Sequence, residues 1–216
     1  MEKKEIESRR ECRSMEVREL RAENPDPDKG PVITGYAAVF DSETDIGGLF
    51  REVIRPGAFR RAIKEKQDVR ALWNHDPNYI LGRTKSGTLR LSEDKRGLKI
   101  EVDPPETEFA ESLVASIRRG DVDQMSFAFT ATEETWTERK DEPTLRELID
   151  VDLYDISPVT FPAYDTTTVG IRTAEDVYSE HIQSLEIQED DGDDDEEQSG
   201  LESDRARAIV DVYRRK

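Results

Sequence analysis

The stretch that most clearly sets the fold is QMSFAF, residues 124–129, which has the two-residue alternation of a β-strand. In an extended strand, Met125, Phe127 and Phe129 lie on one face. Three bulky apolar side chains on one face indicate a strand that packs against a hydrophobic core. Ser126 lies on the opposite face, so the sequence predicts that its hydroxyl points away from the bulky core.

Further strand-like segments surround this stretch, at residues 32–40, 50–54, 69–73, 86–91, 97–102 and 145–161. Two helices interrupt them. One opens at Pro56, because proline in a first helical turn loses no hydrogen bond, and the other runs from Thr107 to the stop signal Gly120. The pattern predicts an α+β fold, a mostly antiparallel, barrel-like sheet flanked by helices.

The two ends of the chain differ from this middle part in composition. We expect residues 1–30 to be a flexible segment and residues 173–200 to be a disordered acidic linker, because residues 186–197 hold nine acids and no base. Residues 201–216 place apolar side chains at helical spacing, which predicts a short amphipathic helix.

Composition excludes several classes of function. The net charge of −18 argues against nucleic-acid binding, which needs a cationic surface. No apolar stretch approaches the ~18 residues of a membrane helix, and the N-terminus lacks a signal peptide, so we expect a soluble, cytoplasmic protein with no membrane partner. Cys12 is the only cysteine and the two histidines are far apart, so we expect no metal and no cofactor.

His75 and Asp155 are the candidate partners of Ser126. His75 follows the strand at residues 69–73, and a histidine is the side chain best suited to activate a serine hydroxyl at neutral pH. Simple alternation places Asp155 on the apolar face of residues 145–161, where a bare carboxylate would be costly, so it needs a partner such as an imidazole.

Other interpretations of these residues remain open. Ser126 alone could be a plain strand residue, His75 a structural histidine, and Asp155 the partner of an arginine. The rival acids for the third position are Glu147, Asp150 and Asp152. His181 is the other histidine that could take part in catalysis. We favour Asp155, because alternation puts Asp150 and Asp152 on the other face, while Glu147 shares the face but lies further from the ISPVTFPAY motif at residues 156–164.

Six motifs, in order along the chain, together resemble the prohead maturation proteases of tailed bacteriophages. They are GYAAVFD (35–41), FREVI to PGAF (50–59), WNHD (73–76), LGRT (81–84), MSFAF (125–129) and ISPVTFPAY (156–164). The resemblance therefore places a prohead protease domain at residues 31–172. It also implies a fold similar to the herpesvirus assembly proteases.

The resemblance implies a serine endopeptidase that trims the scaffolding segment of the major capsid protein and finally cleaves itself. On the matching positions Ser126 is the nucleophile and His75 the general base, while Asp155 stands where the herpesvirus enzymes use a second histidine. The implied partners are the major capsid protein with its scaffolding segment and the chain itself. The resemblance leaves open whether the chain forms a homo-oligomer. The location implied is the immature prohead in the host bacterial cytoplasm, or the bacterial cytoplasm for a prophage-encoded protein. The alternative is a non-catalytic capsid assembly or scaffold module with an acidic tail.

Overall fold

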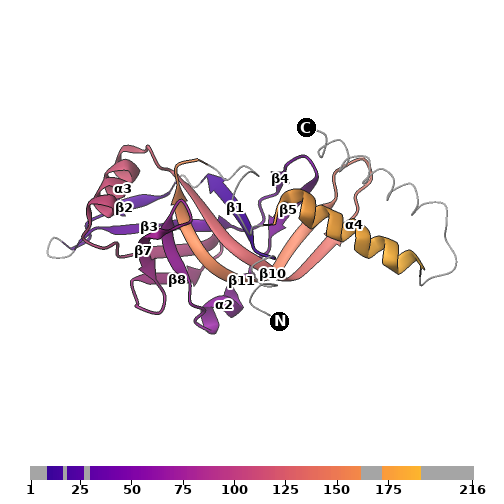
Figure 1. Ribbon diagram of the computed structural model, residues 1–216, viewed down its shortest axis with the longest axis horizontal. Helices are drawn as coiled ribbons and strands as arrows, with labels where there is room; N and C mark the ends of the chain where they lie inside the picture. The colour runs from indigo at the N-terminus through magenta and orange to yellow at the C-terminus, as the bar shows by residue number, and fades with distance from the viewer. Residues whose placement is uncertain (1–8, 17–18, 27–29, 162–171, 191–216) are drawn as a thin grey trace.

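The two longest strands, β10 (Gln124–Thr137) and β11 (Leu145–Val159), form an antiparallel pair that runs through the middle of the molecule (Figure 1). The computed structural model describes residues 9–16, 19–26, 30–161 and 172–190. Most of the buried residues in both strands are apolar, as expected for strands that are covered on both faces. This pair carries most of the polar side chains that the site uses.

The remaining elements attach to this pair or to a second sheet. The strands are β1 (Glu11–Glu16), β2 (Arg21–Glu23), β3 (Val32–Val39), β4 (Thr44–Ile46), β5 (Phe50–Ile54), β6 (Arg70–Trp73), β7 (Asp76–Arg83), β8 (Leu89–Glu93) and β9 (Gly97–Val102). The described helices are α2 (Arg60–Lys64), α3 (Glu108–Arg119) and α4 (Ala174–Asp190). Helices α3 and α4 lie at opposite ends of the molecule (Figure 1).

The strands form two open sheets. One has the order β1-β10-β11-β5-β4, with β6 attached to β11 and β7 to β6, and the other has the order β2-β3-β9-β8. The predicted predominance of strands is confirmed, but the barrel-like closure is wrong. The reason lies in β11, which pairs in parallel with β5 near its start and with β6 near its end, so the sheet branches instead of closing.

The main hydrophobic core lies between the sheets and α3. Leu113, Val114 and Ile117 of α3 are buried there, together with the aromatic side chains of Phe127 and Phe129 from β10. The helix predicted at residues 107–120 is confirmed, and it ends at Gly120, whose φ of 80° is left-handed and favours glycine. No described helix is both long and apolar enough to cross a lipid bilayer.

Both chain ends differ from the sequence-based expectation. The segment 1–30, expected to be flexible, contains β1 and β2, and β1 pairs with β10 over its whole length. The segment 173–200, expected to be disordered, contains α4. Apolar residues at helical spacing, Val177, Tyr178 and Ile182, bury one face of this helix beside Phe50. Residues 191–200 and the predicted helix at 201–216 lie outside the described residues.

Candidate active site

His75 sits at the tip of the β6–β7 hairpin. Trp73 pairs with Asp76, so Asn74 and His75 form a two-residue loop. Their φ angles are 55° and 58°, and positive φ at both loop residues is the pattern of a type I′ turn, which suits the twist of a hairpin. Asp76 is the first residue of β7.

Hydrogen bonds to the end of β11 fix the position of this tip. The backbone N–H of Asn74 donates to the carbonyl oxygen of Pro158 at 3.0 Å, and its side-chain Oδ1 accepts the N–H of Thr160 at 2.8 Å. The backbone N–H of His75 donates to Ser157 Oγ at 3.3 Å. The loop that carries the imidazole is therefore attached to the strand that carries Asp155.

A β-bulge at Tyr154 brings Asp155 onto the face that carries Ser126. Phe129 pairs with Leu153, but the preceding residue Ala128 pairs with Asp155, so Tyr154 has no partner on β10. Paired residues project from the same face of a sheet, so Leu153 faces the core with Phe129 while Asp155 projects from the opposite face with Ser126. The expectation that Asp155 shares the face of Leu153 is therefore wrong, because simple alternation ignores the bulge.

The three predicted residues form a continuous chain of hydrogen-bonding atoms. His75 Nε2 lies 2.7 Å from Ser126 Oγ, and His75 Nδ1 lies 2.6 Å from Asp155 Oδ1. An ionised carboxylate can only accept hydrogen bonds, so Nδ1 carries the proton that is donated to Asp155. In the neutral imidazole with this tautomer, Nε2 has a free lone pair and can accept a hydrogen bond from the Ser126 hydroxyl.

Burial and charge act in opposite directions on Asp155. Burial by itself raises the pKa of this carboxyl group, whose side chain is only 2% exposed. The hydrogen bond from His75, the charges of His75 and Arg10, and the hydrogen bond from Ser157 outweigh burial, so the net shift of the Asp155 pKa is downward. The carboxylate is therefore ionised at neutral pH.

The rival acids are engaged elsewhere. Glu147 accepts a hydrogen bond from Arg55 at 2.5 Å, Asp150 accepts from Arg61, and Asp152 pairs with Arg61 and Gln67. His181 of α4 stacks on Trp136, with ring centroids 4.1 Å apart. Among the residues that the structure describes, these groups do not contact Ser126.

Sequence reasoning missed two residues beside the triad. Ser157 Oγ donates to Asp155 Oδ1 at 3.1 Å, and it lies opposite Ser126 in the β10–β11 register. Its position two residues after Asp155 on one strand is a signal that could have identified it. Arg10 forms an ion pair with Asp155 Oδ2 from the segment expected to be flexible, and no local pattern marks it.

Cys12 also lies beside this site. It pairs with Ala128 in the β1–β10 register, and Ala128 in turn pairs with Asp155. Burial, and next the nearby charge of Asp155, raise the pKa of the Cys12 thiol to about 12. The thiol is therefore uncharged at neutral pH. No cluster of three metal-ligand side chains occurs in the described part of the chain.

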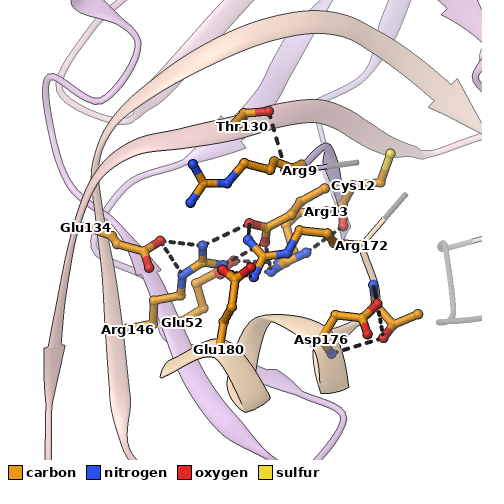
Figure 2. A network of polar contacts seen from close by, with 12 residues as sticks. Arg9, Cys12, Arg13, Glu52, Thr130, Glu134, Arg146, Arg172, Asp176 and Glu180 are labelled. Carbon is orange, nitrogen blue, oxygen red and sulfur yellow. Dashed lines mark hydrogen bonds and ion pairs between the residues drawn. The ribbon is translucent and has the colours of Figure 1, made fainter. Parts of the chain in front are cut away.

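A second group of buried charges, the Arg146 cluster, lies on the same two strands. It consists of Glu11, Arg13, Glu52, Glu134, Arg146 and Arg172, drawn in Figure 2. The guanidinium of Arg146 is fully buried and donates to both carboxylate oxygens of Glu11, at 2.7 and 2.9 Å, and to Glu52 at 2.9 Å. The cluster joins β1, β5, β10, β11 and the segment before α4.

Glu11 is the central acid of the Arg146 cluster. Burial by itself raises the pKa of Glu11, but the charges of Arg146 and Arg13 outweigh it and hold the pKa at about 2. Outside the cluster, Arg172 also donates to Glu180 of α4 at 2.7 Å. The Arg146 cluster contains three glutamates and three arginines, so its formal charges cancel.

Comparison with known proteins identifies the family. No curated protein matches the chain. A solved structure, the capsid assembly protease of bacteriophage T4, aligns with a TM-score of 0.44 and 14% sequence identity, over 69% of this chain and 98% of that chain. The family model described as caudovirus prohead serine protease matches residues 15–182, well over half of the chain. The chain therefore belongs to the prohead serine protease family of tailed bacteriophages.

Proposed function

We propose that the chain is the endopeptidase that removes the scaffolding segment of the phage major capsid protein inside the immature prohead, and that it also cleaves itself. In this proposal Ser126 is the nucleophile, His75 the general base and Asp155 the residue that orients the imidazole. The observation that carries it is the Ser126–His75–Asp155 chain of short contacts, with Nε2 directed at the serine oxygen. The family match supports the reaction class.

The mechanism is acyl transfer. As Ser126 Oγ attacks the scissile carbonyl carbon, His75 Nε2 takes the hydroxyl proton, and Asp155 stabilises the imidazolium that forms. When the C–N bond breaks, the same proton passes from Nε2 to the leaving amine, and an acyl ester remains on Ser126. His75 then removes a proton from a water molecule that attacks the ester, and returns it to Ser126 Oγ.

Access to Ser126 requires a local opening. The serine has no exposed surface, whereas the His75 side chain is 14% exposed. A substrate carbonyl must come within about 3–3.5 Å of Oγ before attack. We infer that local opening of the residues that cover Ser126 admits a small reagent, and that an extended polypeptide stabilises the open form when it binds.

The decisive experiment compares the whole chain with Ser126→Ala and with the matched control Ser116→Ala, on the exposed part of α3. A fluorophosphonate probe, which reacts with activated serines, should add one mass adduct at Ser126 in the wild type and in the control, and none in Ser126→Ala. Self-cleavage and cleavage of the co-expressed capsid protein should fall by about a million-fold in Ser126→Ala only. More than about one per cent of wild-type activity in that variant would exclude Ser126 as the nucleophile.

A further inference from the structure

Arg10 contacts the proposed catalytic carboxylate from outside the predicted protease domain. Asp155 has two oxygens. Oδ1 accepts from His75 Nδ1 and from Ser157 Oγ, and Oδ2 forms the ion pair with Arg10. The Arg10 guanidinium also lies over the Tyr154 ring, 5.0 Å from its centroid. Both carboxylate oxygens are therefore engaged, one by the base and one by a permanent cation.

The structure fixes Arg10 in this place from both sides. Its carbonyl oxygen accepts the backbone N–H of Arg172 at 2.7 Å. The next residue, Glu11, is held by the Arg146 cluster and begins strand β1 along β10. The residue before it, Arg9, accepts a 3.4 Å hydrogen bond from Thr130. The main chain on either side of Arg10 is therefore tied to β10, to β11 and to the segment before α4.

We propose that Arg10 is a positioning residue of the protease, which keeps His75 neutral, and thus able to accept a proton, while Asp155 stays ionised beside it. This inference rests on the proposed function of His75 and Asp155. A buried carboxylate next to a single imidazole favours protonation of that imidazole, because the pair is then neutral as a whole. A guanidinium on the other oxygen supplies that neutralisation permanently, so the imidazole does not need to be charged.

The other groups around His75 and Asp155 do not supply this charge. Cys12, from β1, is uncharged because its pKa is raised to about 12. Ser126 and Ser157 are neutral hydroxyls. Arg70, which pairs with Asp155 in the β6–β11 register, directs its guanidinium to Asp68. Among the described residues around the site, Arg10 is therefore the cation that pairs with Asp155.

The consequence is a specific effect on pH dependence. Loss of the Arg10 charge should favour the imidazolium, so the acidic limb of the pH–rate profile should move to higher pH by on the order of one unit. At a pH on that limb the rate should fall about tenfold, while the rate on the high-pH plateau changes little. A residue that only supported the fold would lower the rate at every pH and leave the limb in place.

The test compares Arg10→Gln, Arg10→Lys and the matched control Arg9→Gln, which removes the same charge from the adjacent, exposed residue. The rate of fluorophosphonate labelling is measured against pH for each full-length variant. We expect the limb to move in Arg10→Gln and to stay in place in Arg10→Lys and Arg9→Gln. An unmoved limb in Arg10→Gln, or an equal movement in Arg9→Gln, would overturn the proposal.

A second measurement needs no catalytic activity. The chain has two histidines, His75 and His181, so imidazole NMR signals can be assigned with a His181→Gln variant. In a Ser126→Ala background, which prevents self-digestion, the titration midpoint of His75 should rise in Arg10→Gln by on the order of one pH unit. An unchanged midpoint would overturn the role of Arg10 whatever the identity of the nucleophile. Failure of the proposed function would instead appear as activity that survives Ser126→Ala.

Discussion

The proposed catalytic triad and the Arg146 cluster each take two members from β10 and β11, yet they neutralise their buried charges in different ways. Arg146 near the start of β11 is fully buried, and its three ion-pair partners are all glutamates. Asp155 near the end of β11 is 2% exposed and is paired with one fixed cation and one histidine. The first arrangement holds segments together, whereas the second leaves one proton free to move.

Two adjacent residues, Arg10 and Glu11, connect the proposed triad to the Arg146 cluster. Glu11 belongs to the Arg146 cluster and Arg10 contacts Asp155, so one short piece of chain connects the fixed charges to the movable one. Buried ion pairs are weak evidence for stability, but loss of one partner is costly because it leaves the other charge unpaired. Substitutions in the triad should therefore affect turnover, and substitutions in the Arg146 cluster should affect the free energy of unfolding.

The largest expected effect is on turnover, from Asp155→Asn. The amide cannot accept the Nδ1 proton as a carboxylate does, and the wrong tautomer of His75 is favoured, so turnover should fall by about four orders of magnitude. Circular dichroism should change little, and the loss of stability should be smaller than for a fully buried ion pair, because the Arg10 side chain that loses its acid is 34% exposed. Combining Asp155→Asn with His75→Ala should add almost nothing, since the residues act as one unit. Additive losses would mean that Asp155 acts independently of His75.

The next largest effect is on stability, from Glu11→Gln. The variant leaves Arg146 and Arg13 with Glu52 as their one shared acid in place of two, and we expect the free energy of unfolding to fall by about 3–5 kcal/mol. Urea unfolding in the Ser126→Ala background measures it. The control is Glu180→Gln, since Glu180 contacts Arg172 from an exposed position, and exposed pairs contribute about 0–1 kcal/mol. Equal losses in the two variants would remove the distinction between a buried cluster and a surface pair.

The sequence predicted more of the site than of its surroundings. Ser126 and the strand that carries it follow from local alternation, and short loops bring His75 to the end of β11. Asp155 was predicted on an incorrect premise, because the bulge at Tyr154 changes which face it uses. A bulge depends on the partner strand, so local alternation cannot reveal it. Sequence reasoning still selected the acid that contacts His75, because a buried acid needs a partner on either face.

Arg10 and the Arg146 cluster were beyond sequence reasoning for a different reason. Residues 9–16 are mostly charged, and a charged segment near a chain end is usually solvated. Their burial depends on Glu52, Arg146 and Arg172, which come from distant parts of the chain. Only the pairing of β1 with β10 brings these charges together. The same pairing shows why the two sheets could not be assigned from the positions of the strands alone.

Acid should weaken the Arg146 cluster before it unfolds the core. The pKa of Glu11 is about 2 in the folded protein, below the ordinary value of 4.5, so its contribution to stability is complete above about pH 4.5. It is lost as the pH falls from 4.5 towards 2 and amounts to on the order of 3 kcal/mol. Urea midpoints across this range should fall more steeply in the parent than in Glu11→Gln. Parallel curves for the two proteins would show that Glu11 is not the group that titrates.

The smallest effect concerns the hairpin that carries His75. Asn74 has a φ of 55° and accepts the N–H of Thr160, so Asn74→Ala combines a left-handed alanine with a lost hydrogen bond. We expect a loss of about 1–2 kcal/mol in stability and at most about a tenfold loss in turnover. Asn74→Gly relieves the backbone but removes the acceptor, whereas Asn74→Asp keeps the acceptor and tolerates the backbone. If turnover depends on the hydrogen bond from Thr160, the turnover of Asn74→Asp should stay closest to the wild type. The turnover of Asn74→Gly should lie between those of Asn74→Asp and Asn74→Ala. A glycine variant with full turnover would mean that the turn alone positions His75, without the contact to Thr160.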